Sequence, residues 1–142
     1  MELFIPSLML ARIKAEALEA FPDEACGLLI GERGADDRIE VRDLVPAPNV
    51  APDRRRHFEV DPAMHLRCQR SLRGSGQQVI GHYHSHPCSA AEPSRTDAES
   101  ITDPAMVWVI VALEGPDRAG AVRAWRVNGN GTDFQEIPLL TQ

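Results

Sequence analysis

The stretch QQVIGHYHSHP at residues 77–87 combines an apolar half, typical of a buried strand, with a half rich in histidines. Its first half, with Val79 and Ile80, is apolar enough for a buried strand, and its second half alternates histidines with other residues. Proline has no N–H to donate to a sheet ladder, so Pro87 ends the pairing. We therefore expect a strand over 77–86 that carries histidines at its end.

Two of these histidines have a spacing suited to one metal ion. Residues two apart on a strand face the same side at about 6.6 Å, so His84 and His86 could both bind it. His82 shares that side, but it would lie roughly 13 Å from His86, which is awkward for one tetrahedral centre. A third ligand from elsewhere fits better, although a polar stripe without any metal would also explain the pattern.

PSRTD at residues 93–97 supplies an oxygen donor for that third position. Asp97 lies eleven residues after His86, which is enough chain for a loop and one helical turn to return its carboxylate to the strand end. The spacing from Ser94 to Asp97 also matches a capping box, which needs no metal, and both interpretations can hold together. Three protein ligands leave a coordination position open, as in catalytic rather than structural zinc sites.

The remainder of the chain predicts a mixed sheet flanked by helices. Apolar residues between Pro6 and Pro22 recur at helical spacing, and Asp61-Pro62 is a typical helix start. The order of elements favours the α/β class. The expected segments are a first helix between Pro6 and Pro22, helices over 63–72 and 93–101, strands over 25–31, 38–45, 58–60, 77–86, 106–113 and 121–127, an edge strand over 134–140, and an exposed loop over 46–57.

Composition narrows the class of protein. A length of 142 residues predicts a single domain over 1–142. The net charge of −6 disfavours nucleic acid as a partner, and no run approaches the roughly 18 apolar residues of a membrane span. The three cysteines are odd in number and include no CxxC pair, which indicates reduced thiols. We therefore expect a cytoplasmic protein.

The motifs together resemble the JAMM (MPN+) metalloprotease family, in which a glutamate precedes HxHP and PSxxD. The corresponding stretches are EACGLL at 24–29, HSHP at 84–87 and PSRTD at 93–97. The resemblance implies that His84, His86 and Asp97 bind one zinc ion per chain. It also implies that Glu24 is the general acid/base and that Ser94 polarises the scissile carbonyl. The implied fold is a cytidine-deaminase-like sandwich with a mixed central sheet between helices.

The resemblance also implies a substrate. The chain is similar to the stand-alone bacterial members, which act on ubiquitin-like sulfur-carrier proteins. The expected reaction is hydrolysis of the amide bond after the carrier's C-terminal Gly-Gly. A glycine tail suits a narrow cleft, because a strand without side chains can approach a metal closely.

Two other functions stay open on the sequence alone. The fold could serve as a non-catalytic MPN-type binding scaffold, or the zinc site could hydrolyse small amides. Asp23 is an alternative base to Glu24, and Cys88 could in principle reach the metal.

Several other residues have more ordinary interpretations. Cys26 and Cys68 are expected in the core, and His57 and His65 are expected to be solvated or packed. The run Arg54–Arg56 is either a solvated face or a docking patch for an acidic carrier.

Overall fold

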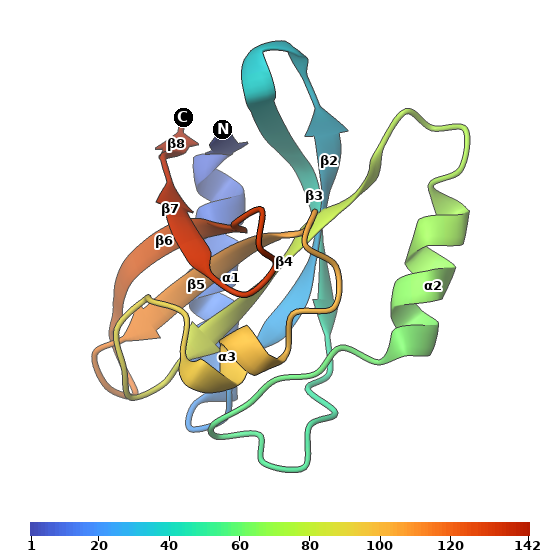
Figure 1. The fold of residues 1–142 in the computed structure, drawn as a ribbon. Coiled ribbons are helices and arrows are strands. Elements are labelled where there is room, and N and C mark those ends of the chain that lie inside the picture. Colours follow the sequence, from blue (N-terminus) through green and yellow to red (C-terminus); the bar gives the residue numbers. More distant parts are fainter.

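The computed structural model describes residues 1–142 and contains one eight-stranded mixed sheet with helices packed on it (Figure 1). The strand order is β7-β6-β5-β4-β2-β3-β1-β8, so β4 lies inside the sheet, antiparallel to β2 and parallel to β5. The expected mixed α/β architecture is confirmed. The strands are β1 (Glu2–Ile5), β2 (Cys26–Arg33), β3 (Arg38–Ala47), β4 (Gln78–His86), β5 (Val107–Leu113), β6 (Ala119–Val127), β7 (Phe134–Ile137) and β8 (Leu139–Thr141), and the helices are α1 (Ser7–Ala20), α2 (Pro62–Ser71) and α3 (Arg95–Glu99).

One face of the sheet is covered by α1, as the helical spacing between Pro6 and Pro22 predicts. Ile13 and Ala17 of α1 are buried against strand residues such as Leu29 and Val109. These residues belong to one apolar cluster of 16 buried side chains, the main core of the protein. Burying a large aliphatic side chain contributes about 1.5–3 kcal/mol, so this face supplies most of the fold's stability.

The opposite face carries α2, α3 and the long loop over 48–61. Its apolar clusters are small, one of them formed by Cys26, Phe58, Trp108 and Val127. In Figure 1, α2 stands away from the sheet, and none of its residues is fully buried. Cys68 of α2 is only half-buried, so the expectation that it lies in the core was wrong. This face thus has space for groups other than packing side chains.

A bulge in β4 sets which side chains reach this second face. Gly81 pairs with Leu29 and Val79 pairs with Ile30, which leaves Ile80 as the extra residue. Ile80 and Tyr83 consequently both lie in the main core, while the histidines from position 82 onward face the other way. Gly81 is required here, because a Cβ atom would lie 2.2 Å from the carbonyl oxygen of Val107.

Several sequence expectations differ from the observed elements. The residues of β1 were not predicted as a strand, and 58–60 is not a strand, because its backbone pairs with the loop at Val50 rather than with the sheet. The predicted edge strand over 134–140 is divided at Pro138 into β7 and β8, which lie at opposite edges. α3 is shorter than predicted and begins after the cap at Ser94. No helix has the length and apolar character needed to cross a membrane.

Candidate active site

Three donor atoms from two segments converge at the end of β4. The Nε2 atoms of His84 and His86 are 3.1 Å apart, and Asp97 Oδ2 lies 3.2 Å from the first and 3.1 Å from the second. His84 and His86 are neighbours on one face of β4, and Asp97 comes from the first turn of α3. The spacing argument thus identified the residues that the fold brings together. His82 is not among them.

The convergence has the dimensions of a metal site. Donors around a tetrahedral zinc with bonds of about 2.0 Å are separated by roughly 3.3 Å, close to the three distances observed. Each of the three contacts would need its own proton to be a hydrogen bond. The two imidazole nitrogens carry at most one proton each and the carboxylate oxygen carries none, so the three contacts cannot all be hydrogen bonds. A cation satisfies all three lone pairs at once, so this donor set fits a zinc ion.

The Nδ1 atoms of the two histidines have different surroundings. His86 Nδ1 lies 2.8 Å from the carbonyl oxygen of Ala90 and donates to it, which directs Nε2 with its lone pair at the site. His84 Nδ1 has no hydrogen-bond partner, but its ring is stacked on Phe58 at 4.2 Å and 18°. Trp108 meets the same ring edge-on at 5.8 Å. Aromatic packing therefore orients His84 where a hydrogen bond does not.

Asp97 has a structural role as well as its place in the donor set. Its Oδ2 accepts a hydrogen bond from Ser94 N at 2.9 Å, and its own N–H donates to Ser94 Oγ at 3.0 Å. This is the capping box predicted from the sequence. Burial raises the pKa of Asp97, but the two histidines and the Ser94 N–H outweigh it and hold the pKa below its usual range. The cap thus fixes an ionised oxygen at the strand end.

Ser94 has a free hydroxyl hydrogen. Its Oγ accepts from Asp97 N and donates to no group of the protein. The residue is only half-buried, unlike Asp97 beside it. The hydroxyl can therefore donate to a substrate oxygen next to the donor set.

Glu24 lies beside the donor set in a buried position. The residue is 5% exposed, and one of its carboxylate oxygens lies within 4.8 Å of the ring nitrogens of both His84 and His86. Asp97 Oδ2 lies within hydrogen-bond distance of both ring nitrogens, whereas no hydrogen bond joins Glu24 to either histidine, so we assign Asp97 to the donor set and leave Glu24 within reach of a water beside it. Burial raises the pKa of Glu24 to about 8. Asp23, the alternative base, forms an ion pair with Arg54 at 3.3 Å instead.

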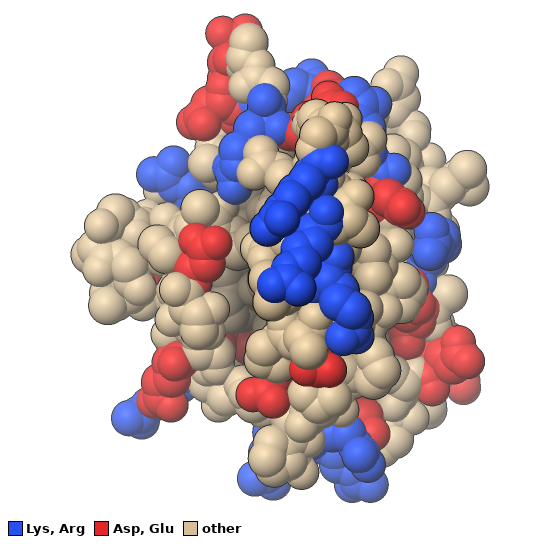
Figure 2. All heavy atoms as spheres, turned by 90° about the vertical axis from the view of Figure 1, so that its right-hand side faces the viewer, with Lys and Arg blue, Asp and Glu red and all other residues tan.

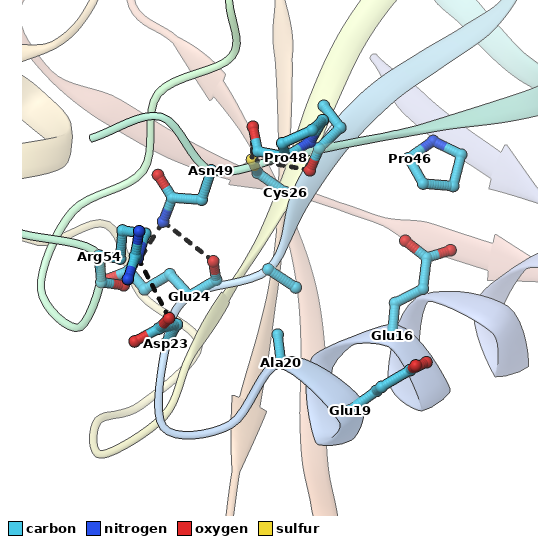
Figure 3. A pocket seen from close by; sticks show the side chains of 12 residues that line it. Glu16, Glu19, Ala20, Asp23, Glu24, Cys26, Pro46, Pro48, Asn49 and Arg54 are labelled. Carbon is cyan, nitrogen blue, oxygen red and sulfur yellow. Dashed lines mark hydrogen bonds and ion pairs between the residues drawn. The ribbon is translucent and has the colours of Figure 1, made fainter. Parts of the chain in front are cut away.

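The backbone around Glu24 is fastened on both sides. Glu24 N donates to Arg54 O at 2.7 Å, and Glu24 O accepts from Asn49 Nδ2 at 3.0 Å. Ala25 N then donates to Ser85 Oγ at 2.8 Å. Figure 3 shows Asn49 and Arg54 around Glu24, at one end of a pocket of about 430 Å³ whose other end is lined by Glu16 of α1. Glu24 is consequently held in place by its peptide atoms.

Asn49 connects this backbone to the loop that carries Phe58. Its Nδ2 also donates to His57 O at 2.9 Å, and its Oδ1 accepts from the N–H groups of Ala51 and Glu59 at 3.0 and 3.1 Å. This one amide side chain thus ties together distant parts of the loop predicted from prolines and arginines, alongside the backbone bond from Val50 N to Glu59 O. Sequence reasoning missed Asn49, Ser85 and Phe58. Only the position of Ser85 inside HSHP gave a signal for any of them.

The other chemically active side chains lie away from the donor set. His82 lines a separate cavity of about 500 Å³, together with His57 and His65, and one nitrogen of each of these rings has no partner. Cys26 is buried with Trp108, as expected, and Cys88 is exposed. Burial raises the pKa of the Cys26 thiol to about 12.

Comparison with known families and proteins gives a consistent result. Residues 6–128 match the family described as prokaryotic homologs of the JAB domain. The chain is 31% identical over 121 residues to a desampylase from Haloferax volcanii, covering 85% of this chain and 80% of the relative. It is 32% identical over 128 residues to the CysO-cysteine peptidase of Mycobacterium tuberculosis, covering 90% of this chain and 84% of the relative.

Solved structures agree with these matches. The solution structure of protein DSY2949 from Desulfitobacterium hafniense superimposes with a TM-score of 0.83 at 29% identity, covering 99% of this chain and 92% of that one. The JAB1/MPN domain protein AF2198 from Archaeoglobus fulgidus has the same fold, with a TM-score of 0.58 at 21% identity and 98% coverage of both chains.

Proposed function

The chain belongs to the prokaryotic homologues of the JAB domain, and from this premise we propose that it is a zinc-dependent peptidase acting on a ubiquitin-like sulfur-carrier protein. The bond hydrolysed is the amide after the carrier's C-terminal Gly-Gly. The supporting observation is the triangle of His84, His86 and Asp97 with its 3.1–3.2 Å edges. The relative named CysO-cysteine peptidase supports a small protein substrate. So does a relative from Thermus thermophilus named "Probable TtuB-protein conjugate cleaving protease", which is 34% identical over 95 residues, covering 67% of this chain and 60% of the relative.

In this proposal, one zinc ion per chain is held by His84, His86 and Asp97. A bound zinc ion acidifies a water and polarises a carbonyl. Glu24 accepts the proton of the attacking water and delivers it to the leaving amine, for which its fixed, buried position is suited. Ser94 donates its free hydroxyl hydrogen to the oxygen of the scissile carbonyl as negative charge develops there.

The wider context follows from the same proposal. Residues 1–142 act as one peptidase domain with a cytidine-deaminase-like sandwich, working in the cytoplasm. The net charge of −6 argues against a nucleic-acid substrate. A narrow cleft leading to the site selects the Gly-Gly tail, because glycine has no side chain and lets the substrate backbone come close to the donor set.

The test combines metal analysis with cleavage. Protein purified without chelator is expected to hold about one zinc per chain. His84→Ala should lose it and Glu24→Gln should retain it, while His65→Ala serves as a control for removing a histidine. Wild type should release cysteine from a ubiquitin-like protein ending in Gly-Gly-Cys, and Glu24→Gln should be slower by at least about a hundredfold.

Other outcomes separate the alternatives. A wild type that stays free of metal when zinc is supplied would exclude a hydrolase and favour a binding scaffold. Cleavage of small amides without cleavage of the Gly-Gly-Cys substrate would favour another zinc amidohydrolase.

A further inference from the structure

A ridge of arginines runs along the outer side of α2. Arg67 and Arg70 of α2 are exposed and lie three residues apart, so they share one side of the helix, and the exposed Arg73 follows in the turn directly after the helix. Figure 2 looks onto the side of the molecule that α2 occupies, and a continuous ridge of basic side chains crosses its middle. Leu66, which is 45% exposed, lies one helical turn before Arg70 on the same side of α2. We call these four residues the α2 ridge.

The charges of the α2 ridge are not used within the protein. None of its three arginines forms an ion pair, whereas Arg38, Arg42, Arg95, Arg118 and Arg123 all do. Residues 54–73 contain six arginines and two acids, in a chain whose net charge is −6. Self-neutralisation does not explain this local excess of positive charge. An approaching acidic surface would be attracted to it.

The α2 ridge lies next to the candidate active site. The inner side of α2, at Pro62 and His65, closes the cavity that Phe58 and His82 also line. Phe58 in turn stacks on His84 of the donor set. A folded protein docked on the outer side of α2 would therefore have its flexible terminus within reach of the site.

We propose that the α2 ridge docks the folded, acidic body of the protein substrate, while its tail enters the site. This rests on the proposed function, because it assigns the partner of that same peptidase. An apolar residue surrounded by unpaired arginines has the composition of an interface centre with a charged rim. The α2 ridge contains none of the residues proposed to take part in catalysis. Changing it should therefore weaken recognition of the whole protein substrate and leave cleavage of the isolated tail unchanged.

The test uses two substrates that share one tail. The first is a peptide of about ten residues ending in Gly-Gly-Cys, and the second is an acidic ubiquitin-like protein with the same ending. The variant is Arg67→Gln/Arg70→Gln/Arg73→Gln. Its matched control is Arg12→Gln/Arg42→Gln/Arg118→Gln, which removes the same charge elsewhere. Surface changes on α2 should alter stability by no more than about 0.5 kcal/mol, which thermal unfolding checks.

The α2 variant should lose on the order of tenfold in kcat/KM on the folded substrate at low salt. The loss should shrink at about 0.5 M salt, where screening is strong. The peptide should be cleaved at the wild-type rate, and the control variant should behave as wild type on both substrates. Equal rates of the α2 variant and the control on the folded substrate would overturn the proposal, as would an equal loss on peptide and protein.

Binding measurements keep this test independent of catalysis. Fluorescence anisotropy of the labelled acidic protein, with the three arginine changes made in a Glu24→Gln background, reports docking even when nothing is cleaved. Weaker binding by the α2 variant without any wild-type cleavage would retain the docking surface and reject the peptidase. A labelled 20-base-pair DNA duplex is the competing occupant, and ridge-dependent binding of DNA with none of the acidic protein would overturn the proposal.

Discussion

The two faces of the central sheet are built on opposite principles. The face under α1 is a continuous apolar core of 16 buried residues. The other face holds only small apolar clusters, and beside them lie four buried polar residues: Glu24, His84, His86 and Asp97. The fifth buried polar residue of the chain, Ser85, lies between the two histidines on β4 and points to the opposite side of the strand. Burying such groups is costly unless they are paired or bind a cation. The first face stabilises the fold, and the second places reactive groups on it.

The largest expected effect comes from removing a donor on the site face. His84→Leu should abolish zinc binding and peptidase activity, because two donors remain in place of three. The unfolding free energy of the metal-free protein should change by no more than about 1 kcal/mol, because the lost contact between His84 and Asp97 is offset by replacing a buried imidazole whose Nδ1 has no partner with an apolar group. Zinc analysis and urea denaturation in chelator measure the two effects. A large loss of metal-free stability would show that both faces contribute alike.

The α1 face should respond in the opposite way. Leu29→Ala should lower the unfolding free energy by about 3 kcal/mol, because it leaves a cavity among fully buried side chains. Zinc stoichiometry of the folded protein should remain at the wild-type value. Leu8→Ala, at a residue that is 81% exposed, is the control and should change stability by no more than about 0.5 kcal/mol. Loss of zinc from folded Leu29→Ala would mean that the two faces are coupled.

A smaller effect is expected at Asn49, which holds the site face together without touching the donor set. Asn49→Asp keeps the acceptor for Ala51 and Glu59 but cannot donate to the carbonyls of Glu24 and His57. We expect kcat to fall on the order of tenfold, with zinc content unchanged, because Glu24 loses its fixed position. Steady-state kinetics and metal analysis check this, with Asn128→Asp as the control for added charge. Unaltered kcat would remove Asn49 from the positioning of Glu24.

The smallest effect concerns thiol reactivity across the site face. Burial raises the pKa of Cys26 to about 12, so at pH 8 only about one thiol in ten thousand is ionised. Cys88 is exposed on the loop after β4. Iodoacetamide should therefore label Cys88 and leave Cys26 unmodified until the protein unfolds, as mass spectrometry can measure. The rate at Cys88 should be the same with and without zinc, and protection by zinc would make Cys88 a ligand.

Local patterns in the sequence predicted most of the elements. The apolar run after Met106 is β5, and the spacing between Pro6 and Pro22 is α1. Patterning failed where pairing is non-local. β1 is too short to show alternation, and Pro138 sends two adjacent segments to opposite edges of the sheet, which no local rule could anticipate.

The residues of the candidate site were predicted by motif spacing, but their support was not. HxH on a strand and a cap three residues before Asp97 fix relative positions within short segments, so these residues could be named in advance. Asn49, Ser85 and Phe58 act through contacts between distant segments. A lone asparagine in a proline-rich loop has no spacing that distinguishes it from a solvated residue.

The sequence by itself therefore determined which atoms are available: two imidazoles at strand spacing, a capped aspartate, and a glutamate ahead of an apolar strand. Only the tertiary structure decided that these atoms meet. The register of β2 against β4, the bulge at Ile80 and the start of α3 together bring three donors to within 3.2 Å of one another. The physical reason is that short-range patterns fix backbone geometry within an element, whereas distances between elements depend on packing across the whole sheet.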